Sequence, residues 1–175
     1  MSCGWENIKL MSGLIVVTGP PGAGKTTVAE LLSARFELSA LVAGDAFFQM
    51  VNRGYIEPWI EAAHEQNKVV IAAAAAAAGR LARGGYTVVF DGVIGPWFLD
   101  AFLAATGLSE IDYVMLLPPE PICLHRIGSR VGHGFADPDA ARHMYAQFAA
   151  AARSDLHVLR ATDAPGSGRS GSRWR

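Results

Sequence analysis

The chain has 175 residues, of which 51% are hydrophobic and 18% are charged, and its formal net charge is −1. This composition indicates one compact globular domain and excludes a disordered chain. The near-neutral charge argues against a broad basic surface for nucleic acid or an anionic membrane, and two cysteines are too few for a disulfide framework.

The first twelve residues carry no periodic pattern, and we expect a loose leader over 1–12. They contain Glu6 and no apolar core of the signal-peptide type. The apolar run 71–78 is too short to span a membrane. We therefore expect a cytoplasmic protein without a membrane partner.

The first predicted strand, the β-branched run 14–17, leads into the segment 19–26, Gly-Pro-Pro-Gly-Ala-Gly-Lys-Thr. This is the G-x-x-x-x-G-K-T spacing of the phosphate-binding P-loop, and apolar residues at helical spacing follow it over 27–35. Backbone N–H groups and the helix N-terminus would form a phosphate cradle. Lys25 would reach the β- and γ-phosphates of ATP, and the Thr26 hydroxyl would ligate Mg²⁺. The predicted nucleotide-binding residues are Gly19, Gly22, Ala23, Gly24, Lys25, Thr26 and Thr27.

A second strand is expected over 38–43, ending at Gly44-Asp45. Ligands of open parallel sheets bind beyond the carboxyl ends of the strands, so Asp45 is expected near the phosphates. Its carboxylate could accept a proton from an attacking hydroxyl or cap the next helix, and the two roles are compatible.

The segment 46–59 is rich in aromatic residues. Any one of them could be an ordinary core residue, but as a group they indicate a flat-walled, apolar acceptor pocket. The candidate acceptor contacts in this part of the chain are Asp45, Phe48, Arg53, Tyr55 and Trp59.

A long alanine-rich helix is expected over 60–83, ended by Gly79 or by the Gly84-Gly85 pair. The strand after it, 86–92, finishes on Asp91, which is the Walker B pattern of a carboxylate that holds Mg²⁺ directly or through water. A helix over 97–103, closed by Gly107, and a strand over 111–117 come next.

The next predicted helix, 120–130, places Arg126 and Arg130 at i and i+4, on one face. A glycine-rich stretch over 131–137 follows and indicates a mobile flap. Arginines beside such a flap can stabilise charge on a transferring phosphoryl group, although a solvated helical face is the ordinary interpretation. His133 could contact phosphate or acceptor. Structural or surface positions are expected for the other histidines, His64, His125, His143 and His157.

A helix over 139–152, a short strand over 156–160 and a flexible basic tail over 164–175 complete the predicted chain. The predicted domain is thus 13–163.

Taken together, these residues resemble the P-loop small-molecule kinases, and the chain is similar to gluconate kinase-like, shikimate kinase-like and chloramphenicol phosphotransferase-like proteins over about 14–162. The specific parts are the P-loop, Gly44-Asp45, and the segment 126–148 with Arg-Val-Gly-His-Gly-Phe followed by Ala-Gln-Phe. The resemblance implies an α/β P-loop NTPase fold: a three-layer sandwich with a five-stranded parallel sheet in the order 2-3-1-4-5, helices on both faces and a small lid.

Position by position, the resemblance makes Lys25 and Thr26 the phosphate and Mg²⁺ residues, Asp45 the acceptor-side acid, and Arg126 and Arg130 the lid arginines. Two features depart from the pattern. The acceptor region has no basic cluster for an anionic sugar acid, which disfavours gluconate and shikimate. The chain also becomes rich in Gly and Ser after 163, where such kinases place an adenine loop and a further helix.

The sequence therefore predicts ATP- and Mg²⁺-dependent transfer of the γ-phosphate to a hydroxyl of a small molecule: a nucleoside, an antibiotic-like natural product or a sugar. One alternative is a kinase acting on an RNA end or a sugar-nucleotide; the near-neutral charge argues against a long nucleic acid. A second alternative is a nucleotide-dependent switch or an ATPase without an acceptor. A small-molecule acceptor is the expected partner, and a monomer and a homodimer both stay open.

Overall fold

The computed structural model describes residues 13–129, 137–152 and 157–159. In these ranges one parallel sheet has the strand order β2-β3-β1-β4-β5. Its strands are β1 Leu14–Thr18, β2 Ser39–Ala43, β3 Thr87–Asp91, β4 Asp112–Leu116 and β5 His157–Leu159. The predicted order 2-3-1-4-5 is confirmed. The predicted leader and basic tail and the flap residues 131–136, including His133, lie outside the described residues.

The central strand β1 is buried along its whole length, which is why its sequence is continuously apolar instead of alternating. Leu14 and Val16 belong to one hydrophobic core, whereas Ile15 and Val17 belong to another, because successive side chains point to opposite faces of the sheet.

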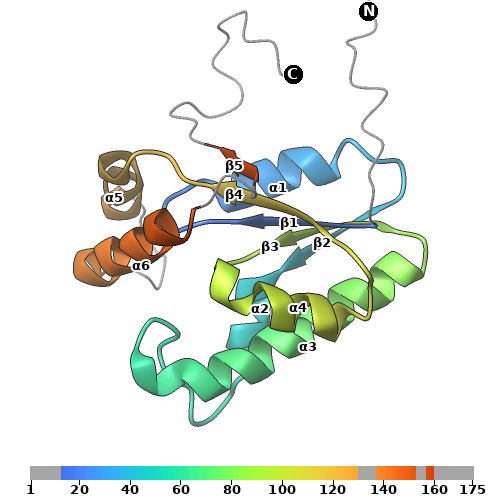
Figure 1. Cartoon of the computed structure of the whole chain (residues 1–175), viewed down its shortest axis with the longest axis horizontal. Helices are drawn as coiled ribbons and strands as arrows, with labels where there is room; N and C mark the ends of the chain where they lie inside the picture. Colours follow the sequence, from blue (N-terminus) through green and yellow to red (C-terminus); the bar gives the residue numbers. More distant parts are fainter. Residues whose placement is uncertain (1–12, 130–136, 153–156, 160–175) are drawn as a thin grey trace, which may run out of the picture.

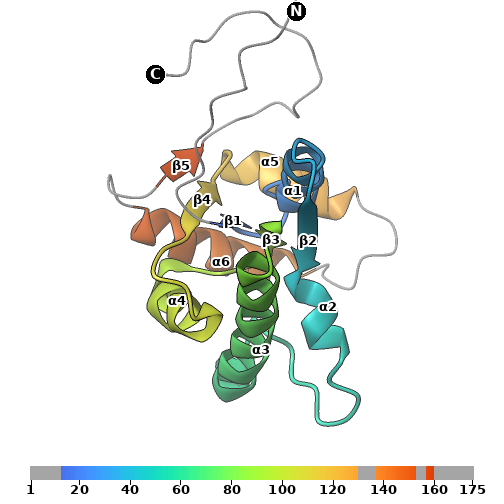
Figure 2. The same cartoon turned by 90° about the vertical axis from the view of Figure 1, so that its right-hand side faces the viewer.

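Helices cover both of these faces, as expected. Figures 1 and 2 show α1 (Lys25–Ser33) and α5 (Glu120–Gly128) on one side of the sheet, and α3 (His64–Arg83), α4 (Leu99–Thr106) and α6 (Pro138–Ala151) on the other. The shorter elements are α2 (Gly44–Gln49) and the 3-10 turns η1 (Glu61–Ala63) and η2 (Pro96–Phe98). None of the helices in the described ranges has the length and apolar character required to cross a membrane.

The alanine-rich helix α3 packs closely against α4. Ala74, Ala75, Ala78 and Gly79 are buried on α3, and a Cβ placed on Gly79 would lie 2.0 Å from the carbonyl oxygen of Thr106. Gly79 was one of the two predicted ends of this helix, but the helix continues to Arg83 and is capped by Gly84. Small side chains here let α3 pack closely against α4 and the sheet.

The helix predicted to reach Arg130 is shorter than expected, because α5 ends at Gly128. The Ser129 hydroxyl donates a hydrogen bond to the carbonyl of Arg126 at 3.2 Å, and glycine and serine both have low helix propensity. Arg130 lies outside the described residues, so its predicted i, i+4 pairing with Arg126 stays a prediction.

Candidate active site

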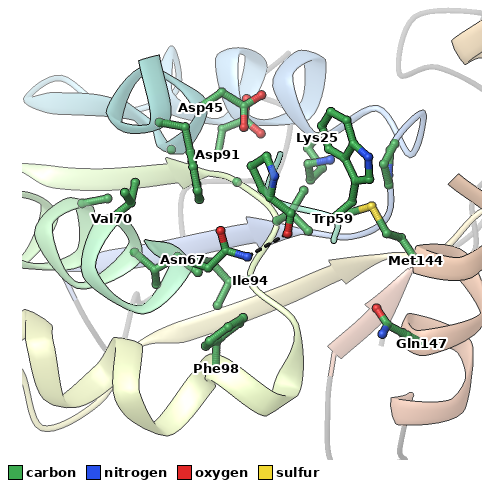
Figure 3. A pocket seen from close by; sticks show the side chains of 18 of the residues that line it. Lys25, Asp45, Trp59, Asn67, Val70, Asp91, Ile94, Phe98, Met144 and Gln147 are labelled. Atoms are coloured by element: carbon green, nitrogen blue, oxygen red, sulfur yellow. Dashed lines mark hydrogen bonds between the residues drawn. The ribbon is translucent and has the colours of Figure 1, made fainter. Parts of the chain in front are cut away.

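A cavity of about 1320 Å³ lies beyond the carboxyl ends of β2 and β3 and beside the P-loop. It is lined by parts of the P-loop, α2, the segment 51–61, the first half of α3, the segment 91–98 and α6. Figure 3 shows Lys25, Asp45 and Asp91 around one part of this space and Asn67, Val70 and Phe98 around another. This is the edge of the sheet at which the sequence predicted the ligands.

The P-loop takes its shape from two glycines in the left-handed region, Gly22 with φ 78° and Gly24 with φ 94°. Gly24 is the N-cap of α1, and a Cβ on Gly22 would lie 2.3 Å from the carbonyl oxygen of Cys123. Side chains at these positions would be strained, and at Gly22 would also clash with the backbone of α5. The loop therefore curls over the N-terminus of α1, the arrangement that favours phosphate.

Lys25 is the first residue of α1, and its Nζ donates a hydrogen bond to the carbonyl of Pro20 at 3.3 Å within the same loop. Lys25 and Thr26 both line the cavity, as do Gly22 and Pro21. The other predicted loop residues, Gly19, Ala23, Gly24 and Thr27, belong to the same turn and first helical residues without lining the cavity. Their predicted contribution is through backbone N–H groups.

Asp91 is the last residue of β3, and only 9% of its surface is exposed. Burial raises the pKa of this carboxyl above its usual value, while a hydrogen bond with Thr26 and the positive charge of Lys25 act in the opposite direction. The negative charge of Asp45 raises it further. Three other predicted site residues, Lys25, Thr26 and Asp45, thus lie close enough to affect the carboxyl group of Asp91.

These side chains fit a Mg²⁺ ion, which prefers oxygen ligands and usually binds through one or two protein oxygens together with water and substrate phosphates. Asp91 supplies a buried carboxylate and Thr26 a hydroxyl. The described residues contain no group of three His, Cys, Asp or Glu side chains that could hold a metal without such a substrate. A divalent cation would also offset the two neighbouring negative charges of Asp45 and Asp91.

The segment after Asp91 is held by buried hydrogen bonds that sequence reasoning missed. The Thr18 hydroxyl donates to the carbonyl of Ile94 at 3.0 Å and accepts from its N–H at 2.8 Å, and the Tyr113 hydroxyl donates to the same carbonyl at 2.7 Å. Burial raises the pKa of Tyr113, so its hydroxyl stays protonated and can donate. A threonine at the end of an otherwise apolar strand was the available sequence signal.

On the acceptor side, Asp45 is exposed in the first turn of α2 and lines the cavity. The helix begins one residue earlier, with Ala43 as N-cap and no side-chain capping bond, so the predicted capping role of Asp45 was wrong. Its negative charge contributes to a raised pKa of Tyr55, after burial and the charge of Glu57. The carboxylate of Asp45 is therefore close to both the Walker B acid and the aromatic segment.

Three of the predicted acceptor contacts, Phe48, Tyr55 and Trp59, line the cavity, and Trp97 and Phe98 join them from the segment after β3. Arg53 does not line it. The chain bends at Gly54, where φ is 75°, and Arg53 is left exposed on the surface. The structure therefore does not bring Arg53 to the cavity, and its contact with the acceptor stays a prediction.

Residues of α3 and α6 complete the cavity, and the sequence analysis missed them. His64 and His143, for which structural or surface positions were predicted, line it together with Asn67, Met144 and Gln147. His64, Asn67, Ile71 and Ala74 recur at helical spacing on α3, a pattern that could have indicated one shared face.

The segment 56–58 is held to α3 by two neighbouring amides. The N–H of Ile56 donates to Gln66 Oε1 at 2.8 Å, and Gln66 Nε2 donates back to the carbonyl of Ile56 at 2.6 Å. Asn67 Nδ2 donates to the carbonyl of Pro58 at 2.7 Å. The aromatic segment beside the cavity is thus anchored by side chains of α3.

Arg126, one of the two predicted lid arginines, contacts the P-loop. Its Nη1 donates to the carbonyl oxygens of Gly22 and Ala23 at 3.3 and 3.4 Å. It does not line the cavity. The structure therefore places Arg126 beside the nucleotide-binding loop, where it supports the loop's backbone.

Comparisons with known proteins show which family and which folds this chain resembles. A family model described as "AAA domain" matches residues 15–134, more than half of the chain. An adenylate kinase of Deinococcus deserti is 28% identical over 141 residues, which are 74% of this chain and 70% of that protein. A cytidylate kinase of Archaeoglobus fulgidus is 29% identical over 86 residues, 49% of this chain and 48% of that protein. The chain spans about half or less of the length of the first three curated relatives it matches.

Solved structures with the same arrangement include a sugar kinase from Janibacter, with a TM-score of 0.64, 21% identity and coverage of 85% of this chain and 83% of that one. A gluconokinase from Sinorhizobium meliloti has a TM-score of 0.61 at 18% identity, covering 87% and 83%. A shikimate kinase from Acinetobacter baumannii, in complex with shikimate, has a TM-score of 0.57 at 18% identity, covering 87% and 85%. Likenesses at this identity show the fold.

Proposed function

The chain belongs to the AAA domain family of P-loop proteins and has the fold of the P-loop kinases, and from this premise we propose that it transfers the γ-phosphate of ATP to a hydroxyl of an uncharged small molecule. One observation carries the proposal. Lys25, Thr26, Asp91 and Asp45 line one cavity, and the first two and Asp45 affect the pKa of Asp91.

Each of these side chains has a role in the proposed reaction. The P-loop N–H groups and Lys25 bind the β- and γ-phosphates, and Thr26 and Asp91 hold Mg²⁺. When bound, Mg²⁺ neutralises charge on the phosphate oxygens. Asp45 orients the acceptor hydroxyl and takes its proton as the new oxygen–phosphorus bond forms and the bond to the leaving ADP oxygen breaks.

The roles of the predicted lid residues are a separate proposal. Arg126 already contacts the P-loop carbonyls, and a change in its hydrogen bonds would let it neutralise charge on the transferring phosphoryl group. Arg130 and His133 lie outside the described residues, and for them the sequence resemblance supports lid-arginine and phosphate- or acceptor-contact roles.

The charges around the cavity favour an uncharged acceptor. Among its described lining residues Lys25 is the single lysine or arginine, whereas three carboxylates, Asp45, Glu61 and Asp91, line it. Since Lys25 is assigned to the nucleotide, the described residues leave no strong cation for a phosphate or carboxylate on the acceptor. Aromatic side chains supply flat apolar walls instead.

The test compares acceptors that differ in charge, for example cytidine with cytidylate, by measuring ADP formation above the background hydrolysis of ATP. We expect turnover of an uncharged acceptor. Lys25→Ala should lower it by about 10³-fold or more, and Asp45→Asn by roughly 10²- to 10⁴-fold. A Lys25→Ala variant with unchanged phosphotransfer would refute the proposed function.

Three other functions would give different results. The similarity to an adenylate kinase and a cytidylate kinase favours a nucleotide acceptor, and turnover of cytidylate with cytidine inert would select that candidate. ATP hydrolysis that no acceptor changes, together with ATP-dependent capture of a protein, would select a nucleotide-dependent switch. Phosphorylation of RNA ends with steep salt dependence would select the RNA-end kinase.

A further inference from the structure

Trp97 is a large aromatic residue that stays half exposed at the cavity. It lines the cavity, and 49% of its surface is accessible. Most tryptophan side chains in folded proteins are largely buried, so an accessible indole at a concave site needs an explanation. Ile94 and Phe98, on either side of it in the chain, also line the cavity, and Figure 3 shows both of them there.

The backbone that carries Trp97 is held in place before and after this residue. Ile94 is fixed by the hydroxyls of Thr18 and Tyr113 through the buried hydrogen bonds described above. The N–H of Phe98 donates to the carbonyl of Gly95 at 2.8 Å, which closes the turn η2 around Trp97. The indole therefore projects from a segment of backbone with little freedom.

Two neighbours also fix the indole ring itself. A Cβ on Gly95 would lie 2.2 Å from Trp97 Cζ2 and 2.4 Å from both Cε2 and Cη2. Short and nearly equal distances to three consecutive ring atoms mean that Gly95 lies against a face of the ring and not beside its edge. The fully buried ring of Phe148, on α6, contacts Trp97 with ring centroids 5.4 Å apart and planes tilted by 59°.

Gly95 is not required by its own backbone conformation. Its φ of −70° and ψ of 158° lie in the extended region that any residue adopts. The three atoms nearest to a Cβ at this position all belong to the Trp97 ring. The glycine thus leaves room for the indole, which forms a rigid aromatic surface at the cavity before any ligand binds.

We propose that Trp97 determines acceptor specificity by packing against a flat aromatic ring of the acceptor. This deepens the proposed function and rests on it. Aromatic rings that meet stacked or edge-to-face gain more than apolar burial alone provides, and a puckered saturated ring of the same size lacks this gain. Because the indole is already held in place, little freedom is lost when the acceptor binds, and the gain appears in affinity.

The experiment uses two matched pairs of uncharged probes: uridine with 5,6-dihydrouridine, and phenyl with cyclohexyl β-D-glucopyranoside. Each pair keeps the same hydroxyls and exchanges a flat ring for a puckered one. For at least one pair we expect the wild-type kcat/KM, followed by ADP release, to favour the flat member about threefold or more, mainly through a lower KM. Cyclohexyl is at least as apolar as phenyl, so burial of apolar surface alone would not produce this preference.

Trp97→Leu should bring this ratio close to one, because leucine is apolar but has no ring, whereas Trp97→Phe should keep part of it. Gly95→Ala should lower the ratio as well, since its methyl group displaces an indole that is still present. Tyr86→Leu is the matched control, because Tyr86 is an exposed aromatic residue that does not line the cavity. Its ratio should stay at the wild-type value.

Both members of a pair are measured on the same protein, so a loss of folded protein or of ATP binding lowers both and leaves the ratio unchanged. A wild-type ratio below about threefold in both pairs would overturn the proposal, as would a ratio that Trp97→Leu does not change or that Tyr86→Leu lowers equally. If Trp97→Leu does not fold, Gly95→Ala decides, and an unchanged ratio in that variant overturns the proposal.

The proposal also fails if all four probes are inert while an uncharged acceptor without a flat ring is phosphorylated. That result leaves the proposed phosphotransfer standing. Failure of the proposed function has a different sign, namely that Lys25→Ala keeps full activity or that ADP forms without any phosphorylated acceptor.

Discussion

Replacing Gly79 by alanine tests the close packing of α3 on α4. A Cβ at this position would lie 2.0 Å from the Thr106 carbonyl oxygen, against 3.4 Å for ordinary contact, so the two helices would have to separate locally by about 1.4 Å. Overpacking of this kind costs roughly 1–3 kcal/mol, and the better helix propensity of alanine returns up to about 1 kcal/mol. We expect a net loss of about 1–2 kcal/mol in the free energy of unfolding, or roughly 2–8 °C in Tm.

Chemical denaturation with circular dichroism would measure this loss. Gly128→Ala is the matched control, because Gly128 also lies in a helix and a Cβ there meets nothing within 4 Å. The control should be unchanged or more stable by less than about 1 kcal/mol. Since α3 also carries Asn67, a displaced helix should raise KM for the acceptor more than KM for ATP. A Gly79→Ala protein as stable as Gly128→Ala would show that α3 and α4 do not approach so closely.

The remaining predictions concern the nucleotide side. Burial raises the pKa of Asp91, so the folded protein favours the protonated carboxyl. The free energy of unfolding should therefore fall as pH rises from the ordinary carboxyl pKa through the raised one. Asp91→Asn should remove this pH dependence and raise the stability of the nucleotide-free protein near pH 7 by on the order of 1 kcal/mol, while Mg²⁺-dependent turnover is lost. Thermal scans across this pH range measure the effect, and a less stable variant would contradict the prediction. Gly22→Ala should abolish ATP binding in calorimetry, because it combines positive φ with a clash against Cys123. Gly54→Ala, with φ 75° and open space, should cost only about 1 kcal/mol and keep ATP affinity, and equal ATP affinity in both variants would remove the clash from the explanation.

The nucleotide side was predictable from the sequence because its determinants are local. The phosphate cradle depends on glycines and a helix start within eight consecutive residues, and the sheet order followed from the resemblance that those residues supported. The place of Asp91 at the end of a buried strand was predictable, since an apolar run that ends in an acid is a local pattern as well.

The acceptor side was less predictable because its residues are brought together by packing. Asn67 and His64 line the cavity because of how α3 is turned against the sheet. The small residues around Gly79 fix that orientation through their close packing. Arg53 was assigned to the pocket from its place between aromatic residues, and the bend at Gly54 leaves it exposed. Residue spacing could have grouped Asn67 and His64 on one face of α3, but it does not show which space that face borders or where the chain bends.

The arginine after β4 shows the same limit. The spacing of Arg126 and Arg130 predicted one helical face; α5 ends at Gly128, and Arg130 lies outside the described residues. Arg126 was predicted to lie near the nucleotide, and it does contact the P-loop, through the carbonyls of Gly22 and Ala23. Its catalytic role stays a prediction.

The central claim is that a phosphoryl group moves from ATP to a hydroxyl of an uncharged small molecule, and mass spectrometry of the acceptor tests it most directly. Wild-type protein and Lys25→Ala would each be incubated with Mg²⁺, ATP and a panel of nucleosides, antibiotics and sugars, with cytidylate, gluconate and shikimate as the anionic members. We expect the wild type alone to add one phosphoryl group to an uncharged member. Phosphorylation confined to the anionic members, or ADP formation with every acceptor unmodified, would contradict the claim.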